Sequence, residues 1–502
     1  MIGGSLLGGT IPQSVSSAQG GAWKQVEIVT ESASAGRPSS ALRAVLAPLA
    51  LAQFICSFAG SNMNVMITDM SEDLNTSVQG IQVAITIFLL VMAALMIPGG
   101  KLTDKYGRKR LFMLGLIVYA IGAVLSAVSP NLGLLILGNS ILEGIGTAML
   151  IPPVYILTTL LFTEFTSRAR AFGVISALGG IGAAAGPLIG GLITSAISWR
   201  AAFIFQALII AVIVFLSRKI TDPLPPDPTR PFDTGGAVLS SVGLVLVVMG
   251  ILAADNNLWL MIILVVAGAL VLALFFRSIR AKEKAGKEPL LSTSLFHNRT
   301  SNLGLVTQNT QWVMLLGTSF VVSAFLQVVR GYNAIQTGVI FTAATLGLLV
   351  SSLAAERLAK RRSQRTLILA GFVLTIAGIA VLLLIVSGSA TAWSFAPGLL
   401  LIGLGLGVML TPSVDVVQSS FPESEQGEIS GLSRSVSNLG SSLGTAIAGT
   451  ILVAGITATP ERSYALAMAS LAVVAVIGLI AAVMLPAEIR SPAAQEAPQT
   501  ES

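Results

Sequence analysis

Long apolar segments alternate with short polar segments along most of the chain. A helix that crosses a bilayer needs roughly 20 mostly apolar residues, and fourteen segments are close to that length or exceed it. They lie near residues 42–66, 78–100, 111–129, 132–154, 171–195, 201–218, 234–253, 258–276, 302–328, 335–356, 366–387, 393–413, 429–455 and 464–485. The pattern predicts an all-α integral membrane protein with about 14 transmembrane helices.

Basic residues collect in every second loop between these segments. They lie in the loops at 101–110, 168–170, 218–230, 277–287 and 360–365, whereas the other loops hold little beyond Arg200, Arg330 and Arg462. Cytoplasmic loops of membrane proteins are enriched in Lys and Arg. We therefore predict a multi-pass protein of the cell (plasma) membrane with both termini in the cytoplasm.

The composition supports a membrane protein and excludes several other classes. Hydrophobic residues make up 54% of the chain and charged residues 10%, against roughly 25% charged in a soluble domain. The net charge of +6 comes from the basic loops, so we expect a lipid bilayer and no nucleic acid as partner. Because Cys56 is the only cysteine, neither a disulfide framework nor a thiolate metal site is expected, and we expect no cofactor.

Loop lengths divide the chain into a six, two, six plan. We expect a disordered cytoplasmic tail at 1–40, a six-helix half at 41–220, a linker with two extra helices at 221–300, a second six-helix half at 301–486 and a disordered cytoplasmic tail at 487–502. A faint repeat aligns residues 101–109 with 357–365, each after the second segment of its half. Duplicated halves with the substrate site between them are a common design of transporters.

The loop after the second segment carries a specific motif. It reads Gly99-Gly-Lys-Leu-Thr-Asp-Lys-Tyr-Gly-Arg-Lys-Arg110 and resembles the G-x-L-x-D-[RK]-x-G-[RK]-[RK] signature of the major facilitator superfamily. The matching residues are Gly100, Asp104, Gly107, Arg108 and Arg110. The resemblance implies a cytoplasmic latch between the two halves; the alternative is a charged loop that only sets topology.

The fifth segment carries a second motif. Its residues Gly173, Gly182, Gly186, Pro187, Gly190 and Gly191 resemble the antiporter signature G-x8-G-x3-G-P-x2-G-G of the same superfamily. Glycines on one face let two helices approach closely. The resemblance implies an exporter or exchanger, and the alternative is ordinary packing of small residues.

Further segments resemble the fourteen-helix drug:proton antiporter family. They are Ser198-Trp-Arg-Ala-Ala-Phe203, Phe232-Asp-Thr-Gly235, Glu288-Pro-Leu-Leu291 and Leu295-Phe-His-Asn-Arg299. The resemblance implies the major facilitator fold in a monomer. It also implies secondary active export of lipophilic or amphipathic small molecules (multidrug-type efflux) in exchange for protons, by alternating access.

Two charged positions typical of that family are absent. Ala59 stands where the family usually has an aspartate in segment one, and Ser140 where it has an arginine in segment four. Glu143 remains at bilayer depth, and an intramembrane carboxylate is a functional candidate because burial favours its protonated form. We predict Glu143 as the proton-coupling residue; the alternatives are a structural hydrogen bond or a carrier that uses no protons.

Polar residues elsewhere at spanning depth are candidates for the substrate cavity. They are Asn62, Asn64, Gln82, Thr86, Gln308, Asn309, Gln311, Trp312 and Asn438. They predict a mostly apolar pocket with a few polar groups, which suits a small-molecule substrate of amphipathic character; each residue alone could instead join two helices by a hydrogen bond. Asp415 and Arg434 are a candidate ion pair, with a structural or gating role.

Three other classes compete with a proton-coupled exporter. A proton-independent carrier or facilitator of lipid-like or other small solutes fits the absent charges at Ala59 and Ser140. We do not expect an enzyme, because the chain lacks H-E-x-x-H and G-x-S-x-G motifs and has one histidine, His297. A channel would need a glycine-rich filter or rings of charge, and neither is apparent.

Overall fold

The computed structural model describes residues 40–162, 164–254, 257–359, 361–385, 391–422 and 425–487. Residues 1–39 and 488–502, which make up nearly all of the two predicted tails, lie outside the described residues. The chain divides into two compact units, Met1–Arg43 and Ala44–Ser502.

Fourteen helices in the described part of the chain are long and apolar enough to cross a membrane, which confirms the prediction from the hydrophobic pattern. The first six spans are built from α2 (Ser40–Asn62) with η1 (Met63–Val65), α4 (Val78–Tyr106), α5 (Arg108–Ala127), α6 (Leu132–Leu135) with η2 (Ile136–Glu143) and α7 (Gly144–Leu161), α8 (Phe165–Ala196) and α9 (Trp199–Ser217). We call these spans the first helix group. The short helix α3 (Ile67–Asp73) precedes α4.

Two spans follow, α10 (Thr234–Leu252) and α11 (Leu258–Lys284). The remaining six, the last helix group, are α12 (Arg299–Ala324) with η4 (Phe325–Val329), α13 (Ala334–Ala359), α14 (Gln364–Ile385), η5 (Ala392–Phe395) with α15 (Ala396–Gln418), α16 (Gln426–Val453) and α17 (Pro460–Val483). The short turn η3 (Thr293–Phe296) leads into α12. No strand occurs in the ranges that the structure describes.

Polar side chains mark where several helices begin. The Ser77, Ser198 and Asn298 side chains accept hydrogen bonds from the backbone N–H groups of Gly80, Ala201 and Ser301. Each cap satisfies one of the N–H groups that lack a partner in the first turn of a helix. The end of α4 is marked differently, by Gly107 with a φ of 95°, a conformation that side-chain-bearing residues rarely adopt.

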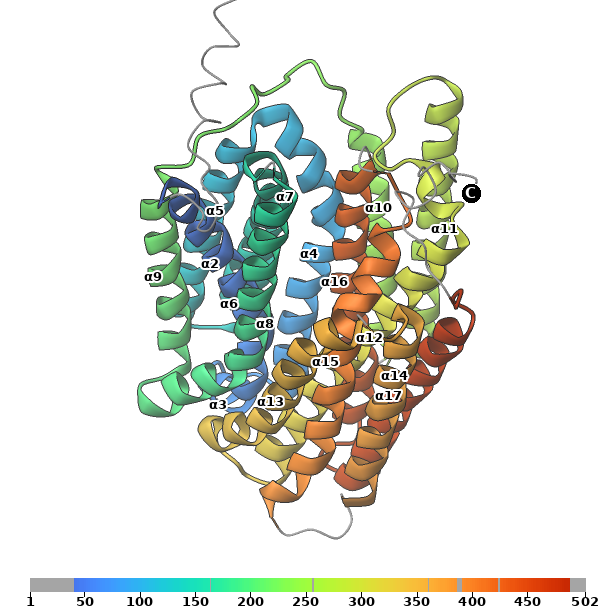
Figure 1. The fold of residues 1–502 in the computed structure, drawn as a ribbon. Coiled ribbons are helices and arrows are strands. Elements are labelled where there is room, and N and C mark those ends of the chain that lie inside the picture. Colours follow the sequence, from blue (N-terminus) through green and yellow to red (C-terminus); the bar gives the residue numbers. More distant parts are fainter. Residues whose placement is uncertain are drawn as a thin grey trace, which may run out of the picture. The chain divides into compact units, whose positions relative to one another are not determined.

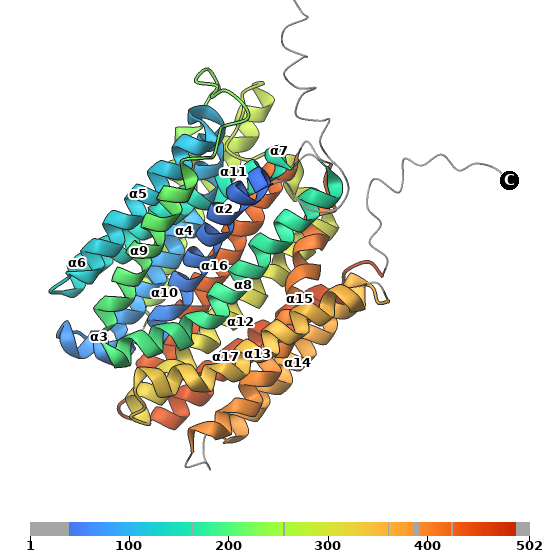
Figure 2. The same ribbon diagram turned by 60° about the vertical axis from the view of Figure 1, so that its left-hand side comes forward.

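Two long contacts join the first and last helix groups. The helices α4 and α16 lie side by side along most of their length, as do parts of α8 and α13 (Figures 1 and 2). Hydrogen bonds tie α4 to α16 at successive levels, with the Ser442 hydroxyl donating to the Thr86 carbonyl at 3.2 Å and the Ser435 hydroxyl to the Ala93 carbonyl at 2.6 Å.

The two central helices, α10 and α11, pack on each other, and α10 also contacts α4 and α16. Most of α11 is exposed and apolar, with Trp259, Ile263 and Leu270 among its exposed side chains. An apolar exposed face of this kind is expected of a helix that faces lipid. Because α10 contacts both α4 and α16, the pair of α10 and α11 lies beside the place where α4 and α16 meet.

Candidate functional site

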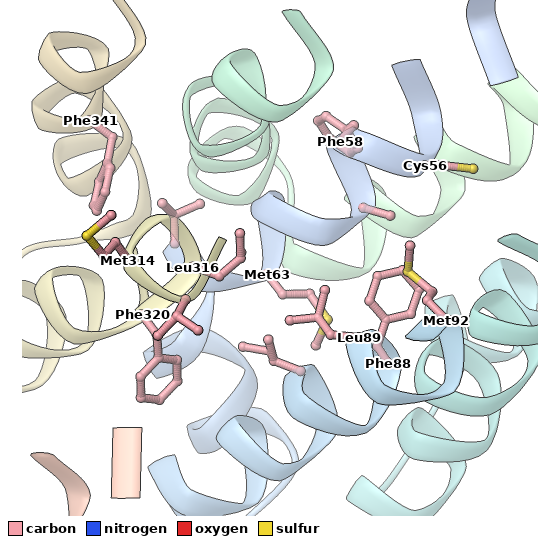
Figure 3. Packing of buried hydrophobic residues seen from close by; sticks show 14 of the residues in the cluster. Cys56, Phe58, Met63, Phe88, Leu89, Met92, Met314, Leu316, Phe320 and Phe341 are labelled. Atoms are coloured by element: carbon pink, nitrogen blue, oxygen red, sulfur yellow. The ribbon is translucent and has the colours of Figure 1, made fainter. Parts of the chain in front are cut away.

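A cavity of about 140 Å³ lies between the first and last helix groups. Side chains of α2, α4, α7 and α8 line it from one group, and side chains of α12, α13, α15 and α16 from the other. Figure 3 shows Leu89 and Met92 of α4 at one side of this region and Phe341 of α13 at the other. Apolar side chains make up most of the wall: Leu89, Met92, Met96, Ile151, Leu315, Leu316, Phe341, Leu348, Leu399, Ile402 and Leu406.

Three polar residues of the cavity wall, Arg434, Gln53 and Ser57, are joined through Tyr155 in a hydrogen-bonded chain that crosses between the two helix groups. Arg434 on α16 donates from Nη2 to the Tyr155 hydroxyl on α7, and its guanidinium lies 4.8 Å from the centroid of the Tyr155 ring. The Tyr155 hydroxyl donates to Gln53 Oε1 on α2 at 3.2 Å. Gln53 Nε2 then donates to the Ser57 hydroxyl at 3.1 Å.

The two ends of the helix bundle are named here by their charged groups. The basic end carries Asp104, Arg108 and Arg230, and the opposite end carries Asp73 and Arg200. At the opposite end Asp73 accepts hydrogen bonds from Arg200 and from Trp199 Nε1. The hydrogen bond from Arg200, with a smaller one from Trp199, holds the pKa of Asp73 below its ordinary value.

Direct contacts between the helix groups close the cavity toward the opposite end. Asn64 Nδ2 donates to the Ser319 hydroxyl at 3.1 Å, and Gln327 Nε2 donates to the Asn64 carbonyl at 2.8 Å. The Thr68 N–H donates to Gln327 Oε1 at 3.2 Å. Each of these bonds joins the first helix group, or the segment after α2, to α12 or η4.

Glycines allow α8 to approach α2 and α13 closely. A Cβ atom added at Gly191 would lie 2.5 Å from the Ala334 carbonyl oxygen, and one at Gly182 would collide with the Phe54 carbonyl. Gly186 faces Ser61, and Gly190 faces Asn62 at 3.1 Å. Pro187 lines the cavity, and its carbonyl abuts Gly338 of α13.

Gly173 differs from the other glycines of this motif, because no atom lies within 4 Å of an added Cβ there. The glycines of this motif therefore do not all pack against the same helix. Gly182, Gly186 and Gly190 face α2, Gly191 faces α13, and Gly173 faces open space.

The predicted latch residues lie at the basic end. Asp104 accepts from Arg108 and from Arg230, each at 2.9 Å. The Asp104 carbonyl also accepts from the Asp227 N–H at 3.4 Å, so the linker after α9 covers this loop. Gly107 makes the turn, Gly100 lies 3.8 Å from Pro152 as measured from an added Cβ, and Arg110 is exposed.

A neighbouring residue, Lys101, joins the helix groups at this end. Lys101 of α4 pairs with Glu428 of α16 at 2.5 Å and with Glu288 at 3.2 Å. The motif loop therefore lies beside an ion pair between the groups. The latch role of Asp104 and Arg108 stays a prediction.

Asp233 holds the linker against the two central helices. Its carboxylate accepts from the Gly236 N–H at the start of α10 at 2.6 Å, from the Leu290 N–H at 3.1 Å and from Lys282 of α11. Burial acts to raise the pKa of Asp233, but the hydrogen bonds from Lys282, Gly236 and Leu290 outweigh it and lower the pKa below its ordinary value.

Glu143 is buried inside the first helix group and does not line the cavity. It ends the π-helical turn η2 and packs beside Gly122 of α5. The Ser126 hydroxyl donates to Glu143 Oε1 at 3.4 Å, and Oε2 has no partner among the described residues. Nearby on α5, the Tyr119 hydroxyl donates to Gln206 Oε1 of α9 at 2.5 Å.

The two neutral positions, Ser140 and Ala59, are buried. The Ser140 hydroxyl donates to the Ala84 carbonyl of α4 at 2.7 Å, and Ala59 packs in the core. Ser140 and Glu143 both lie in η2, and of these two buried residues Glu143 carries the carboxylate.

Of the polar residues expected around the cavity, Trp312 and Asn438 line it. Four others bond neighbouring helices instead. Gln82 donates to the Thr445 and Ala446 carbonyls of α16, Gln308 accepts from Ser433, Asn309 donates to the Val436 carbonyl and Gln311 donates to the Leu406 carbonyl. Asn64 closes the opposite end, and the Asn62 side chain and the Thr86 hydroxyl are buried without a hydrogen-bond partner among the described residues.

The candidate ion pair between Asp415 and Arg434 is not formed. Among the described residues Asp415 takes part in no ion pair, and Arg434 bonds Tyr155 instead. Arg434 points into the cavity, whereas Asp415 lies on an exposed part of α15. Sequence reasoning overlooked Tyr155, Gln53 and Ser57, although the spacing of Gln53 and Ser57 places two polar groups on one face of a helix.

The described residues contain no group of three or more His, Cys, Asp and Glu side chains placed to hold a metal ion.

Comparisons with known proteins agree with one another. The family model of the Major Facilitator Superfamily matches residues 49–445 and, in a second match, 310–500. The puromycin resistance protein pur8 of Streptomyces alboniger is 30% identical over 406 residues, which cover 80% of each chain. The multidrug efflux pump LfrA of Mycolicibacterium smegmatis is 28% identical over 412 residues, covering 82% of this chain and 80% of that protein.

A third relative, the multidrug resistance protein Stp of Mycobacterium tuberculosis (strain CDC 1551 / Oshkosh), is 27% identical over 402 residues, covering 80% of this chain and 74% of that protein. Among solved structures, a POT family transporter in complex with a thioalcohol conjugated peptide aligns with a TM-score of 0.66 and 16% identity, covering 88% of this chain and 96% of that one. At that identity the likeness concerns the fold alone.

Proposed function

Because the chain belongs to the major facilitator superfamily, we propose that it is a secondary transporter that exports lipophilic or amphipathic small molecules from the cell. The proposal rests on one observation, the mostly apolar cavity that lies between the two helix groups, with a few polar groups on its wall. Ligand sites for amphipathic molecules have this construction. Relatives named for drug resistance and efflux support the same direction of transport.

The arrangement of contacts supports alternating access. Between the helix groups, hydrogen bonds from Asn64 and Gln327 close the opposite end, and the ion pair of Lys101 with Glu428 joins the groups at the basic end. Rocking of one group against the other would exchange these contacts around a fixed cavity. We place the basic end, and with it both termini, on the cytoplasmic side.

We assign proton coupling to Glu143. Its carboxyl group is buried, has one oxygen without a partner among the described residues and lies next to the Ser126 hydroxyl. A charge there is costly, about 2.5–3.5 kcal/mol on insertion scales for acidic or basic side chains, so the group favours a bound proton. Since Glu143 lies behind the cavity wall, it would act on transport through the packing of η2 against α4 and α5.

The test is uptake of the neutral dye Nile red and of the cation ethidium by inside-out vesicles, with and without an imposed pH gradient. Wild-type protein is compared with Glu143→Gln and with Asp415→Asn, a matched loss of another carboxylate at spanning depth. Uptake of either dye that depends on the gradient in the wild type and in Asp415→Asn, but not in Glu143→Gln, supports the assignment. Uptake that ignores the gradient in all three proteins points to a proton-independent carrier, which the neutral residues Ala59 and Ser140 also favour.

A further inference from the structure

Arg434 is the one charged side chain among the described residues that line the cavity. It lies on α16, and Ser437, Asn438 and Ser441 continue the same face of that helix along the cavity wall. The rest of the wall is mainly apolar. The cavity therefore has one cationic strip facing apolar side chains.

The Arg434 guanidinium has donors to spare. A guanidinium carries five N–H donors in a planar fork, and the Tyr155 hydroxyl is its hydrogen-bond acceptor among the described residues. The Tyr155 ring lies against its face, 4.8 Å from centroid to guanidinium carbon. Neither contact supplies a negative charge, so the positive charge of Arg434 is not neutralised by its neighbours.

Acidic side chains do not compete for this position. Glu143 is buried on the far side of the cavity wall inside the first helix group, and Asp415 lies outside the lining of the cavity. A bound cation would therefore meet Arg434 with no carboxylate on the described wall to offset the repulsion. A carboxylate, sulfonate or phosphate group would instead match the guanidinium fork.

We propose that the cavity selects amphipathic anions, with Arg434 binding the anionic group and the apolar wall around Leu316 and Phe341 holding the apolar body. This substrate class rests on the proposed export function and narrows it. The anion would use the guanidinium donors that the Tyr155 hydroxyl leaves free, so the contact of Arg434 with Tyr155 across the helix groups can persist.

The experiment measures binding of three probes that share a pyrene body and differ in charge: pyrenebutyrate, pyrenebutanol and pyrenebutyl-trimethylammonium. Binding to the purified full-length protein is followed by energy transfer from tryptophan to pyrene, since Trp312 lines the cavity. Trp312→Phe supplies the background signal from the detergent micelle and from the other tryptophans. Uptake of Nile red and of pyrenebutyrate by inside-out vesicles is measured separately and reports on export.

We expect the wild type to bind pyrenebutyrate at least tenfold more tightly than the trimethylammonium probe. Arg434→Gln should abolish this preference, and Arg434→Lys should retain part of it because lysine keeps the charge and loses the fork. Arg280→Gln, which removes a positive charge from an exposed position on α11, is the matched control and should keep the full preference.

Equal binding of the three probes by the wild type, or tighter binding of the cation, would overturn the inference. So would a preference for the carboxylate that persists in both Arg434 variants. Absence of uptake of both Nile red and pyrenebutyrate, together with a charge preference that depends on Arg434, would leave the binding inference standing and reject export, so the two failures are distinguishable.

Discussion

The crossing of α8 and α13 offers a sharp test of how the opposite end closes. In Gly191→Ala the new Cβ would lie 2.5 Å from the Ala334 carbonyl oxygen, where ordinary contacts begin at 3.4 Å, so the helices must separate by about 0.9 Å. Overpacking of this kind costs about 1–3 kcal/mol. Alanine also stabilises helices over glycine by about 0.8–1.0 kcal/mol, but this gain is the same in every conformation that keeps α8 helical.

The substitution should therefore disfavour the conformation closed at the opposite end relative to one in which α8 and α13 have moved apart. A penalty of 1–3 kcal/mol corresponds to a shift of about 5–150-fold in the ratio of the two populations. Export should slow as well, because the transport cycle needs both conformations.

The native Cys56 reports this shift. It is the only cysteine in the chain, lines the cavity and is 3% exposed in this conformation. We expect Gly191→Ala to raise the rate at which a membrane-impermeant maleimide, added at the opposite end, modifies Cys56 by about 5–150-fold. Gly173→Ala is the control, since no atom lies within 4 Å of its added Cβ.

Modification of Cys56 at the wild-type rate in Gly191→Ala would refute the reasoning. An equal acceleration in Gly173→Ala would also refute it, because the effect would then come from the loss of a glycine and not from the contact with α13.

Three further predictions concern the links at other levels of the bundle. Gln82→Leu removes the hydrogen bonds that the two N–H donors of Gln82 Nε2 make to acceptors on α16, at about 0.6 kcal/mol each, and should lower the melting temperature in detergent; an unchanged melting temperature would contradict this role. Asp104→Asn loses ion pairs with the buried Arg108 and the exposed Arg230, so it should cost more stability than the roughly 1 kcal/mol of an exposed pair and should reduce dye uptake; full uptake would reject the latch. Because the pKa of Asp233 is lowered in the folded protein, the ionised carboxylate stabilises the fold at pH values above the ordinary pKa of an aspartate. This stabilisation is lost as the pH falls through the lowered pKa of the folded protein. The difference in melting temperature between wild type and Asp233→Asn should therefore be present at pH 7 and shrink below about pH 4, and a constant difference would argue against it.

Hydrophobic patterning was sufficient to locate the membrane-spanning helices. Every predicted apolar segment corresponds to a spanning helix, because backbone groups in lipid must pair within their own segment and a helix does this without help from the rest of the chain. The turn at Gly107 is local in the same sense, since it depends on the absence of a side chain at one position.

The residues that line the cavity could not be predicted from the hydrophobic pattern. Gln82, Gln308 and Gln311 are as polar as Gln53, yet they bond neighbouring helices while Gln53 lines the cavity. The direction in which a polar side chain points follows from which helix packs against it, and the residues that decide this lie at least 95 positions apart in the chain. Arg434 is the clearest case, because its partner is Tyr155 and not the nearby Asp415.

By itself, the sequence determined the number of spanning helices, the alternation of basic loops and the family signatures, all of which are encoded in short stretches of chain. Only the tertiary structure decided that Glu143 lies behind the cavity wall, that Gly191 and not Gly173 meets a neighbouring helix, and that Arg434 is the charge facing the cavity. These outcomes depend on how helices distant in sequence pack, and in a bilayer that packing is set by close contact and hydrogen bonds between helices, since lipid tails are as apolar as the helix surfaces.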